Sequence, residues 1–423
     1  MSPAELRPQD ETATAQHETA TAQHETATAA GAALMGSSSR RRLGAGVIGF
    51  GWMGQAHARS LLRIPTLFGE RAYDPVLIAC ADTTPERLRL ARDSFGFARV
   101  DDAWQSVISD PEVEVVFISA PNMLHVELAR AAAEAGKPVF CEKPVGGTPE
   151  QVREAAAAVA GAGVMSGVGY CYRWAPLVQY ARELIASGQL GEITNYRGRF
   201  FSMYGADPFG LNSWRFQLDE AGYGVTSDLL SHAVDLALAL IGPIDSVCGV
   251  AETFIRQRPL PVGAASHYGR GRPEDPHGPV TNEDYAALLC RFACGAHGTF
   301  EVSRTMVGPE SEMAFDVYGT RGALSWNLER MNELRLYRAT DEAGRGFTRV
   351  LGGERFPHHG AFAPGSGIGI GFEDLVAIED HEFLSALCTG RPFEPSFEAA
   401  RQFVEVQDAL LRSIESGRWE EVA

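Results

Sequence analysis

The chain has 423 residues, of which 45% are hydrophobic and 22% are charged, a composition typical of a globular protein large enough for two domains. The formal net charge of −17 argues against nucleic acid as a partner, because little on such a surface would neutralise phosphates. No apolar run approaches the ~18 residues of a membrane-spanning helix, and the N-terminus lacks the apolar core of a signal peptide. We therefore expect a cytoplasmic protein without a membrane partner.

Residues 1–43 are predicted to be a disordered, low-complexity tail. Within it, residues 11–30 contain near-identical seven-residue units that lack the apolar stripe of a coiled coil. His17 and His24 in these units could bind a metal, but a solvated repeat is the simpler interpretation. No metal site is predicted elsewhere, since the seven cysteines lack Cys-x-x-Cys zinc spacing and are expected to be reduced.

Strand-like apolar runs alternate with helical segments over residues 44–166, and this order predicts an α/β domain with a parallel, doubly wound Rossmann sheet. The strands are expected at Ala45–Gly49, Val76–Ala81, Val113–Ser119, Val139–Glu142 and Val164–Tyr170. The helices are expected at Gly54–Arg63, Pro85–Phe95, Met123–Ala135 and Pro149–Ala160.

After Tyr170 strands follow strands, which predicts an α+β domain at residues 167–395 with a large, mostly antiparallel, open sheet. The expected strands are Ile193–Phe201, Ser246–Arg256, Asp284–Phe292, Gly298–Arg304 and Glu312–Tyr318. Helices are expected at Trp174–Ser187, from Asp228 through Ile241, and at Ser396–Ser416, which opens a C-terminal segment at 396–423. The Gly/Pro-rich stretches 258–279 and 352–371 are expected to be long loops.

The first motif that carries chemistry is a GxGxxG segment that follows an apolar strand and opens a helix. The first glycine permits a tight turn, the second lets the backbone approach a pyrophosphate, and the third permits close helix packing. The alternative is a glycine turn that binds no ligand. The residues predicted to bind a dinucleotide here are Gly49, Phe50, Gly51, Trp52, Met53 and Gly54.

Asp82, at the end of the second predicted strand, is the expected ligand of the adenosine ribose. An acid there accepts hydrogen bonds from both ribose hydroxyls and repels a 2′-phosphate, and no arginine follows it immediately. NAD is therefore favoured over NADP as the cofactor. The spacing from the glycine motif is longer than usual, which we attribute to an insertion at residues 65–70. The alternative is that Asp82 only caps the next helix.

Lysine is rare in this chain, since only Lys137 and Lys143 occur among its 37 lysine and arginine residues. A lysine is a compact charge whose pKa responds to burial, whereas arginine stays protonated. Lys143 is therefore a candidate for proton transfer or substrate contact, although on residue type alone a surface lysine is an equally good interpretation.

Asp228, His232 and Asp235 are spaced to lie on one face of a helix that is otherwise apolar. Buried ionisable groups are costly unless they are paired or used, and histidine suits general base catalysis near neutral pH. A core histidine bonded to Asp228 or Asp235 is the alternative, and without the other motifs it is the stronger one.

With these motifs in order, the chain resembles the glucose-fructose oxidoreductase/inositol dehydrogenase (Gfo/Idh/MocA) family from residue 44 to about residue 418. The resemblance rests on the segments 46–54, 120–125, 142–144, 169–173 and 224–235. It implies hydride transfer between nicotinamide and a secondary alcohol of a sugar or cyclitol. It also implies a homodimer or homotetramer formed through the C-terminal sheet.

Carried over to this chain, the resemblance makes Lys143 the active-site lysine and Asp228 and His232 the family's aspartate–histidine pair. His232 would take the hydroxyl proton, Lys143 would hydrogen-bond the same oxygen, and Asp228 would orient His232 or bind a neighbouring hydroxyl. Positions that line the nicotinamide side of the groove are Ala120, Pro121, Asn122, His125, Glu142 and Lys143. Softer candidates for substrate contact are Tyr172, Trp214, Arg215 and Tyr223.

We therefore predict an NAD-dependent sugar or cyclitol dehydrogenase of the CH–OH class. The acidic charge and the arginine-rich composition also permit an aminated or secondary-metabolite sugar as the substrate. One alternative is a non-catalytic dinucleotide-binding sensor, which would not need Lys143, Asp228 and His232. Another is a reductase of the same fold that acts on a non-sugar substrate.

Overall fold

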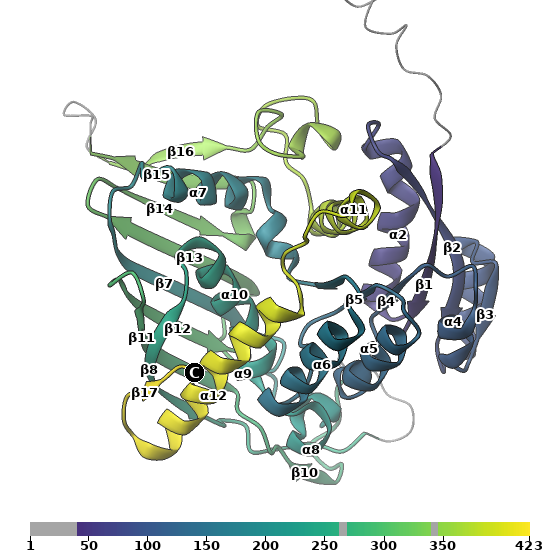
Figure 1. Cartoon of the computed structure of the whole chain (residues 1–423). Helices are drawn as coiled ribbons and strands as arrows, with labels where there is room; N and C mark the ends of the chain where they lie inside the picture. The colour runs from purple at the N-terminus through teal and green to yellow at the C-terminus, as the bar shows by residue number, and fades with distance from the viewer. Residues whose placement is uncertain (1–39, 262–268, 340–345) are drawn as a thin grey trace, which may run out of the picture. The chain divides into compact units, whose positions relative to one another are not determined.

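The computed structural model describes residues 40–261, 269–339 and 346–423 (Figure 1). Almost all of the predicted tail, and part of the long loop predicted at 258–279, lie outside the described residues. Among the described residues, no helix combines the length and the apolar character that crossing a bilayer requires. All seven cysteines are free thiols, and four of them are buried.

The N-terminal part contains the predicted Rossmann sheet, with six strands in the order β3-β2-β1-β4-β5-β6. The pairs β1–β4, β2–β3, β4–β5 and β5–β6 are parallel. The strands are β1 (Arg41–Ile48), β2 (Tyr73–Ala81), β3 (Arg99–Asp101), β4 (Val115–Ile118), β5 (Val139–Cys141) and β6 (Ser166–Val168). The helices are α2 (Trp52–Leu67), α3 (Pro85–Leu90), η1 (Ala91–Phe95), α4 (Gln105–Ser109), η2 (Asn122–Leu124), α5 (His125–Glu134) and α6 (Pro149–Ala162).

Helix α2 runs further than predicted and contains Pro65 inside its last turn. A proline costs a helix one backbone donor, but here the helix ends two residues later, at Leu67. Arg71 then donates hydrogen bonds of 2.9 Å to the carbonyls of Pro65 and Phe68, which satisfies two acceptors at the helix end. The segment 65–70, which we attribute to an insertion, therefore contains the end of this helix and its cap.

The C-terminal part contains a nine-stranded sheet in the order β16-β15-β14-β13-β7-β12-β11-β8-β17. Only the β7–β12 pair is parallel among the described pairings of this sheet, which confirms the predicted mostly antiparallel sheet. Its strands are β7 (Ile193–Ser202), β8 (Ile244–Glu252), β11 (Tyr285–Phe292), β12 (His297–Ser303), β13 (Ser311–Gly319), β14 (Gly322–Asn327), β15 (Glu333–Arg338), β16 (Thr348–Leu351) and β17 (Glu420–Glu421). A separate hairpin pairs β9 (Gln257–Pro259) with β10 (His277–Pro279).

Helices cover one face of this large sheet, and the other face carries none in Figure 1. The helical segments are η3 (Cys171–Trp174), α7 (Pro176–Ala186), η4 (Trp214–Phe216), α8 (Leu218–Ala221), α9 (Val225–Asp228), α10 (Leu230–Leu240), η5 (Leu328–Arg330), η6 (His359–Ala361), α11 (Phe372–Thr389) and α12 (Phe397–Ser416). Helix α10 packs on β7 and β12, and α12 packs on β8 and also on α6 of the Rossmann part.

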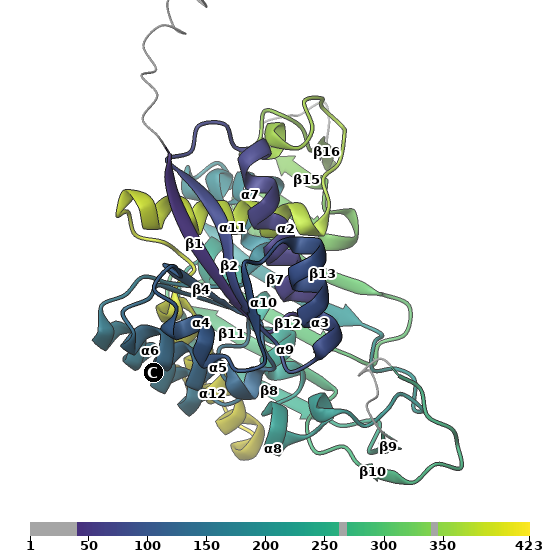
Figure 2. The same ribbon diagram turned by 90° about the vertical axis from the view of Figure 1, so that its right-hand side faces the viewer.

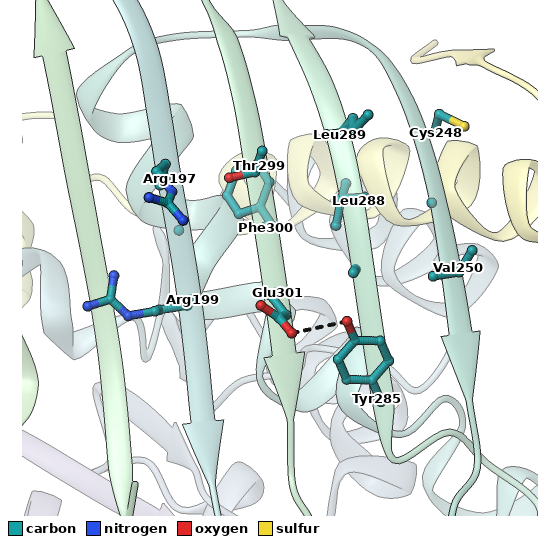
Figure 3. A pocket seen from close by; sticks show the side chains of 13 residues that line it. Arg197, Arg199, Cys248, Val250, Tyr285, Leu288, Leu289, Thr299, Phe300 and Glu301 are labelled. Atoms are coloured by element: carbon teal, nitrogen blue, oxygen red, sulfur yellow. Dashed lines mark hydrogen bonds between the residues drawn. The ribbon is translucent and has the colours of Figure 1, made fainter. Parts of the chain in front are cut away.

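The side of the large sheet without helices is a hollowed surface that we call the open face (Figure 3). Along β11 and β12 buried residues alternate with more exposed ones, as expected when one side of a sheet is covered and the other is not. Polar side chains of this face include Arg197, Arg199, Thr299 and Glu301, and an apolar one is Leu289.

Helix α11, which the sequence analysis did not identify, lies against α2 of the Rossmann part (Figure 2). Ion pairs join the two helices at Arg59–Glu373 and Arg63–Asp374. Helix α11 thus attaches a late segment of the chain to the helix that begins at the glycine motif.

Candidate active site

The glycine motif forms the turn between β1 and α2, and its three glycines have different surroundings. Gly49 has a φ of +89° and donates a hydrogen bond of 2.8 Å to the Ala81 carbonyl. A Cβ on Gly54 would lie 2.0 Å from the Gly49 carbonyl oxygen, so helix and turn pack too closely for any side chain. A Cβ on Gly51 would meet no heavy atom within 4 Å. Only the middle glycine therefore faces open space, as the approach of a pyrophosphate requires.

Two further features suit an anionic ligand at this turn. The first turn of α2 contains no acidic residue, and no side chain caps its N-terminus. The N–H groups at a helix start attract anions, so this end can hold a cofactor pyrophosphate. The loop thus fits a dinucleotide.

Asp82 ties this loop to the end of β2. Its carboxylate accepts hydrogen bonds from the backbone N–H of Phe50 at 2.7 Å and of Thr84 at 2.8 Å. Arg87, five positions further along the chain, reaches the same carboxylate at 3.3 Å. Asp82 therefore also shapes the start of α3, while it places a negative charge beside the glycine turn.

The predicted nicotinamide-side residues lie at the carboxyl ends of β4 and β5, where several of them hold the backbone. The ring nitrogens of buried His125 lie 2.7 Å from the Ala120 carbonyl oxygen and 2.8 Å from that of Pro144. Burial lowers the pKa of His125 despite these acceptors. Asn122 donates a hydrogen bond of 2.6 Å to the Ala221 carbonyl. Pro121 precedes Asn122 at the start of η2.

Lys143, directly after β5, forms an ion pair with Asp228 from the C-terminal part. Its Nζ atom lies 2.7 Å from Asp228 Oδ1 and 3.2 Å from the Asp228 carbonyl oxygen. Tyr204, which follows β7, donates a hydrogen bond of 3.1 Å to Asp228 Oδ2. The structure thus brings the first two predicted catalytic residues together and adds a tyrosine that sequence reasoning missed.

Asp228 and His232 do not share one continuous helix, in contrast to the sequence prediction. Helix α9 ends at Asp228 and α10 begins at Leu230. The Asp228 carbonyl accepts from Lys143 Nζ and from the Ser231 hydroxyl, at 3.2 and 3.1 Å. In a continuous helix, the same carbonyl would accept a hydrogen bond from the backbone N–H four residues further on. The break leaves Asp228 facing Lys143, while Asp235 pairs instead with Arg173.

His232 lies in the first turn of α10 among aromatic rings. Its ring centroid is 4.6 Å from that of Tyr172, 5.9 Å from that of Phe200 and 6.0 Å from that of Tyr170. Within the described ranges, neither ring nitrogen forms a hydrogen bond. His232 is therefore not the bonded core histidine of the alternative interpretation, and its nitrogens remain available to a substrate.

Burial keeps His232 neutral, and the neighbouring charges keep Asp228 ionised. Burial, with the nearby charge of Lys143, lowers the pKa of His232 well below its usual range, although Asp228 opposes this effect. Burial would raise the pKa of Asp228, but Lys143 and Arg215 more than offset it and hold that pKa far below the usual range. A neutral imidazole beside a lysine–aspartate pair can accept a proton while a cation stabilises the oxygen that loses it.

Among the softer candidates, Tyr172 lies near the predicted catalytic histidine, since its ring contacts that of His232. Arg215 stacks on Trp214 with its guanidinium carbon 4.5 Å from the ring centroid, and its charge acts on Asp228. Tyr223 is only partly buried, and its backbone N–H bonds the Gly147 carbonyl at 3.2 Å. The geometry thus favours Tyr172 and Arg215 over Tyr223 as substrate contacts.

Replacement of Tyr204 with phenylalanine is expected to lower kcat/KM by about 10- to 100-fold, the equivalent of ~1.5–3 kcal/mol for a hydrogen bond to a charged group. The loss follows because Asp228 would keep Lys143 but lose its second fixed partner. Steady-state kinetics measures it. The matched control is Tyr285→Phe, which removes a tyrosine–carboxylate bond of 3.0 Å to Glu301 on the open face. Equal activity in the two variants would exclude a role for Tyr204.

Comparisons with known proteins identify the family to which this chain belongs. A family model described as "Oxidoreductase family, NAD-binding Rossmann fold" matches residues 43–170, and a "GFO/IDH/MocA C-terminal domain" model matches residues 178–325. The levoglucosan dehydrogenase of Pseudarthrobacter phenanthrenivorans is 37% identical over 90% of this chain and 98% of its own length. A scyllo-inositol 2-dehydrogenase (NAD(+)) of Bacillus subtilis is 28% identical over 66% of this chain and 72% of its own.

A solved structure of levoglucosan dehydrogenase in complex with NADH and levoglucosan superimposes with a TM-score of 0.84, at 35% identity. The alignment covers 90% of this chain and all of that one (100%). The chain therefore belongs to the Gfo/Idh/MocA family of oxidoreductases. Its predicted fold class, its NAD cofactor and its class of reaction, oxidation of a sugar or cyclitol alcohol, are confirmed.

Proposed function

We propose that this NAD-dependent dehydrogenase oxidises a secondary hydroxyl of levoglucosan or of a closely related sugar. The observation that carries the proposal is the similarity to levoglucosan dehydrogenase along almost the whole length of both chains. The inositol dehydrogenase match is weaker and covers less of this chain, so a cyclitol is the second candidate.

In the proposed mechanism, His232 accepts the proton of the substrate hydroxyl. Its neutral state and its free ring nitrogens support this role. Lys143 hydrogen-bonds the same oxygen and stabilises the negative charge that develops on it, while Asp228 fixes the ammonium at 2.7 Å. Bound NAD supplies the hydride acceptor. The products are a ketone, reduced cofactor and one proton.

The substrate is tested by following NADH absorbance with purified protein, NAD, and levoglucosan, glucose, two inositols and an aminoglycoside in turn. We expect the highest kcat/KM with levoglucosan and no turnover in the His232→Ala variant. A higher kcat/KM with an inositol would assign the chain to the cyclitol enzymes instead. NAD binding without turnover of any compound would favour the sensor alternative.

The open face is proposed to join copies of this chain into a homodimer or homotetramer. In support, it is a hollowed surface on which no helix of the described residues lies, and it mixes apolar groups such as Leu289 and Val250 with the charges of Arg197 and Glu301. The molar mass from light scattering tests the assembly, and a monomer would contradict it. The cytoplasmic location stays a prediction.

A further inference from the structure

A completely buried histidine that the mechanism does not use lies behind the active-site lysine. His57, in α2, has its Nε2 atom 3.0 Å from Glu142 Oε1 and its Nδ1 atom 2.9 Å from Asp380 Oδ1. Glu142 follows β5, and Asp380 lies in α11. We call these residues the His57 triad. It joins segments separated by as many as 323 positions, so no local sequence pattern predicts it.

The triad is ionic. Burial lowers the pKa of His57, but the two carboxylates outweigh it and raise that pKa well above its usual range. His57 is then an imidazolium that donates one N–H to each carboxylate. The neighbouring Glu379 is also fully buried, and its carboxyl has no hydrogen-bond partner within the described residues. Burial and the charges of Glu142 and Asp380 raise the pKa of Glu379, which keeps it neutral.

The second oxygen of Glu142 is held on the side of the active site. Glu142 Oε2 accepts a hydrogen bond of 3.2 Å from the Lys143 backbone N–H. A Cβ on Gly169 would lie 2.7 Å from Glu142 Oε1, so the carboxylate occupies space that only a glycine leaves. Glu142 thus has one orientation, fixed by His57 from behind and by Lys143 and Gly169 around it.

A cofactor held at the glycine turn would extend its nicotinamide half toward this carboxylate. The glycine turn after β1 suits the pyrophosphate, and Asp82 at the end of β2 suits the adenosine half. The nicotinamide half must then extend the other way, over the ends of β4 and β5, to meet a substrate held by Lys143 and His232. Oxidised nicotinamide is cationic and the reduced ring is neutral, so a fixed anion there discriminates between them.

We propose that His57 and Asp380 are positioning residues that hold Glu142 as a fixed negative charge beside the nicotinamide, and so favour binding of oxidised over reduced cofactor. This inference rests on the catalytic placement of Lys143 in the proposed function, but not on the identity of the sugar. It assigns to the triad a role in setting the balance between NAD+ and NADH on the enzyme.

The test measures the dissociation constants of NAD+ and NADH by calorimetry, without any sugar, in the full chain. In Glu142→Gln the ratio of the NAD+ dissociation constant to the NADH dissociation constant is expected to rise about tenfold. This is the low end of the change in an equilibrium constant that one charge at ~4–6 Å from another causes. His57→Gln should also raise the ratio, because it removes the ring nitrogen that holds Glu142 Oε1 at 3.0 Å, and the carboxylate is then no longer fixed in place. The double variant should add little to either single change.

The matched control is His381→Gln. It removes a histidine of α11, the helix that also holds Asp380, and this histidine bonds the Tyr73 hydroxyl at 2.9 Å rather than Glu142. Its ratio should match that of the unchanged protein. If His57→Gln does not fold, Asp380→Asn serves as the second variant. It keeps the side-chain volume but removes a carboxylate that holds the His57 ring and raises its pKa, so its ratio should also rise. An unchanged ratio in Glu142→Gln would overturn the proposal. So would a change in Glu142→Gln that neither His57→Gln nor Asp380→Asn shares.

Because no sugar is present, these outcomes do not depend on the proposed substrate. If levoglucosan is not oxidised but the ratio shifts as expected, the substrate assignment fails alone. If levoglucosan is oxidised and the ratio does not move, the triad inference fails alone.

Discussion

Replacement of Lys143 with alanine is expected to lower kcat by about 10²- to 10³-fold, the usual loss when one group that stabilises a developing oxyanion is removed. The affinity for NAD should stay within about twofold, because Lys143 bonds Asp228 rather than the glycine turn or Asp82. Steady-state kinetics and NAD calorimetry measure the two effects. A large loss of NAD affinity with little change in kcat would contradict the assigned role.

The pH profile supplies a second readout of the same variant. Since the Lys143 charge helps to depress the pKa of His232, its removal should raise that pKa. The acid limb of kcat/KM, below which His232 is protonated and cannot accept a proton, should therefore move to higher pH in Lys143→Ala. Folding defects alone would not move it in this direction.

We expect that an arginine at position 143 cannot take over the function of Lys143. A guanidinium is planar, larger, and bonds carboxylates in a fork, whereas the ammonium of Lys143 is a compact charge shared between a carboxylate and a carbonyl of Asp228. We expect Lys143→Arg to remain at least about tenfold below the natural protein. Full activity would remove the argument that this arginine-rich chain retains a lysine for its chemistry.

The parts of the fold that the sequence predicted are those with local causes. The β1–α2 turn follows from glycine geometry at Gly49 and Gly54, and α6 begins where Thr148 accepts a hydrogen bond from the Gln151 N–H at 3.4 Å. Helix α12 ends at Gly417, whose φ is +66°. Each signal acts within a few residues, so a single sequence is enough to read it.

Helix α11 had comparable local signals and was still missed. Asp374 accepts a hydrogen bond of 2.8 Å from the Gly371 N–H at its start, and Gly390 ends it in the left-handed region. The glycine-rich stretch before it suggested a long loop, and the buried acids Glu379 and Asp380 obscure its apolar face. Of these two acids, Asp380 is buried against His57, a partner that only the folded chain brings near.

In the active site, too, some features follow from local sequence and others only from the tertiary fold. Sequence motifs identified Lys143, Asp228 and His232, but their pairing differs from the expected one. The resemblance implies that Asp228 orients His232 or binds a neighbouring hydroxyl of the substrate. Its carboxylate bonds Lys143 and Tyr204 rather than His232. A carboxylate pairs with whichever donors the tertiary fold presents, and helical spacing alone cannot reveal donors from β5 or from the end of β7.

Replacement of His232 with alanine is expected to lower kcat by about 10²- to 10⁴-fold, the range for loss of a general base. In the natural protein, burial and the Lys143 charge depress the pKa of His232, so the acid limb of kcat/KM should lie below the usual range of histidine. The residual kcat/KM of His232→Ala should no longer fall at low pH through protonation of this histidine. The control is His297→Ala, which removes an exposed histidine of β12 and should leave the profile unchanged.

A second variant at position 232 separates catalysis from packing. His232 contacts Tyr172 and Phe200, so its loss also leaves a cavity in an aromatic cluster. His232→Asn keeps more of the side-chain volume but cannot serve as a base near neutral pH, and it should be as inactive as His232→Ala while it unfolds at a higher temperature. If His232→Asn instead retained activity with an unchanged acid limb, the proton acceptor would have to be another group, and the Tyr172 hydroxyl beside the ring would be the next to test.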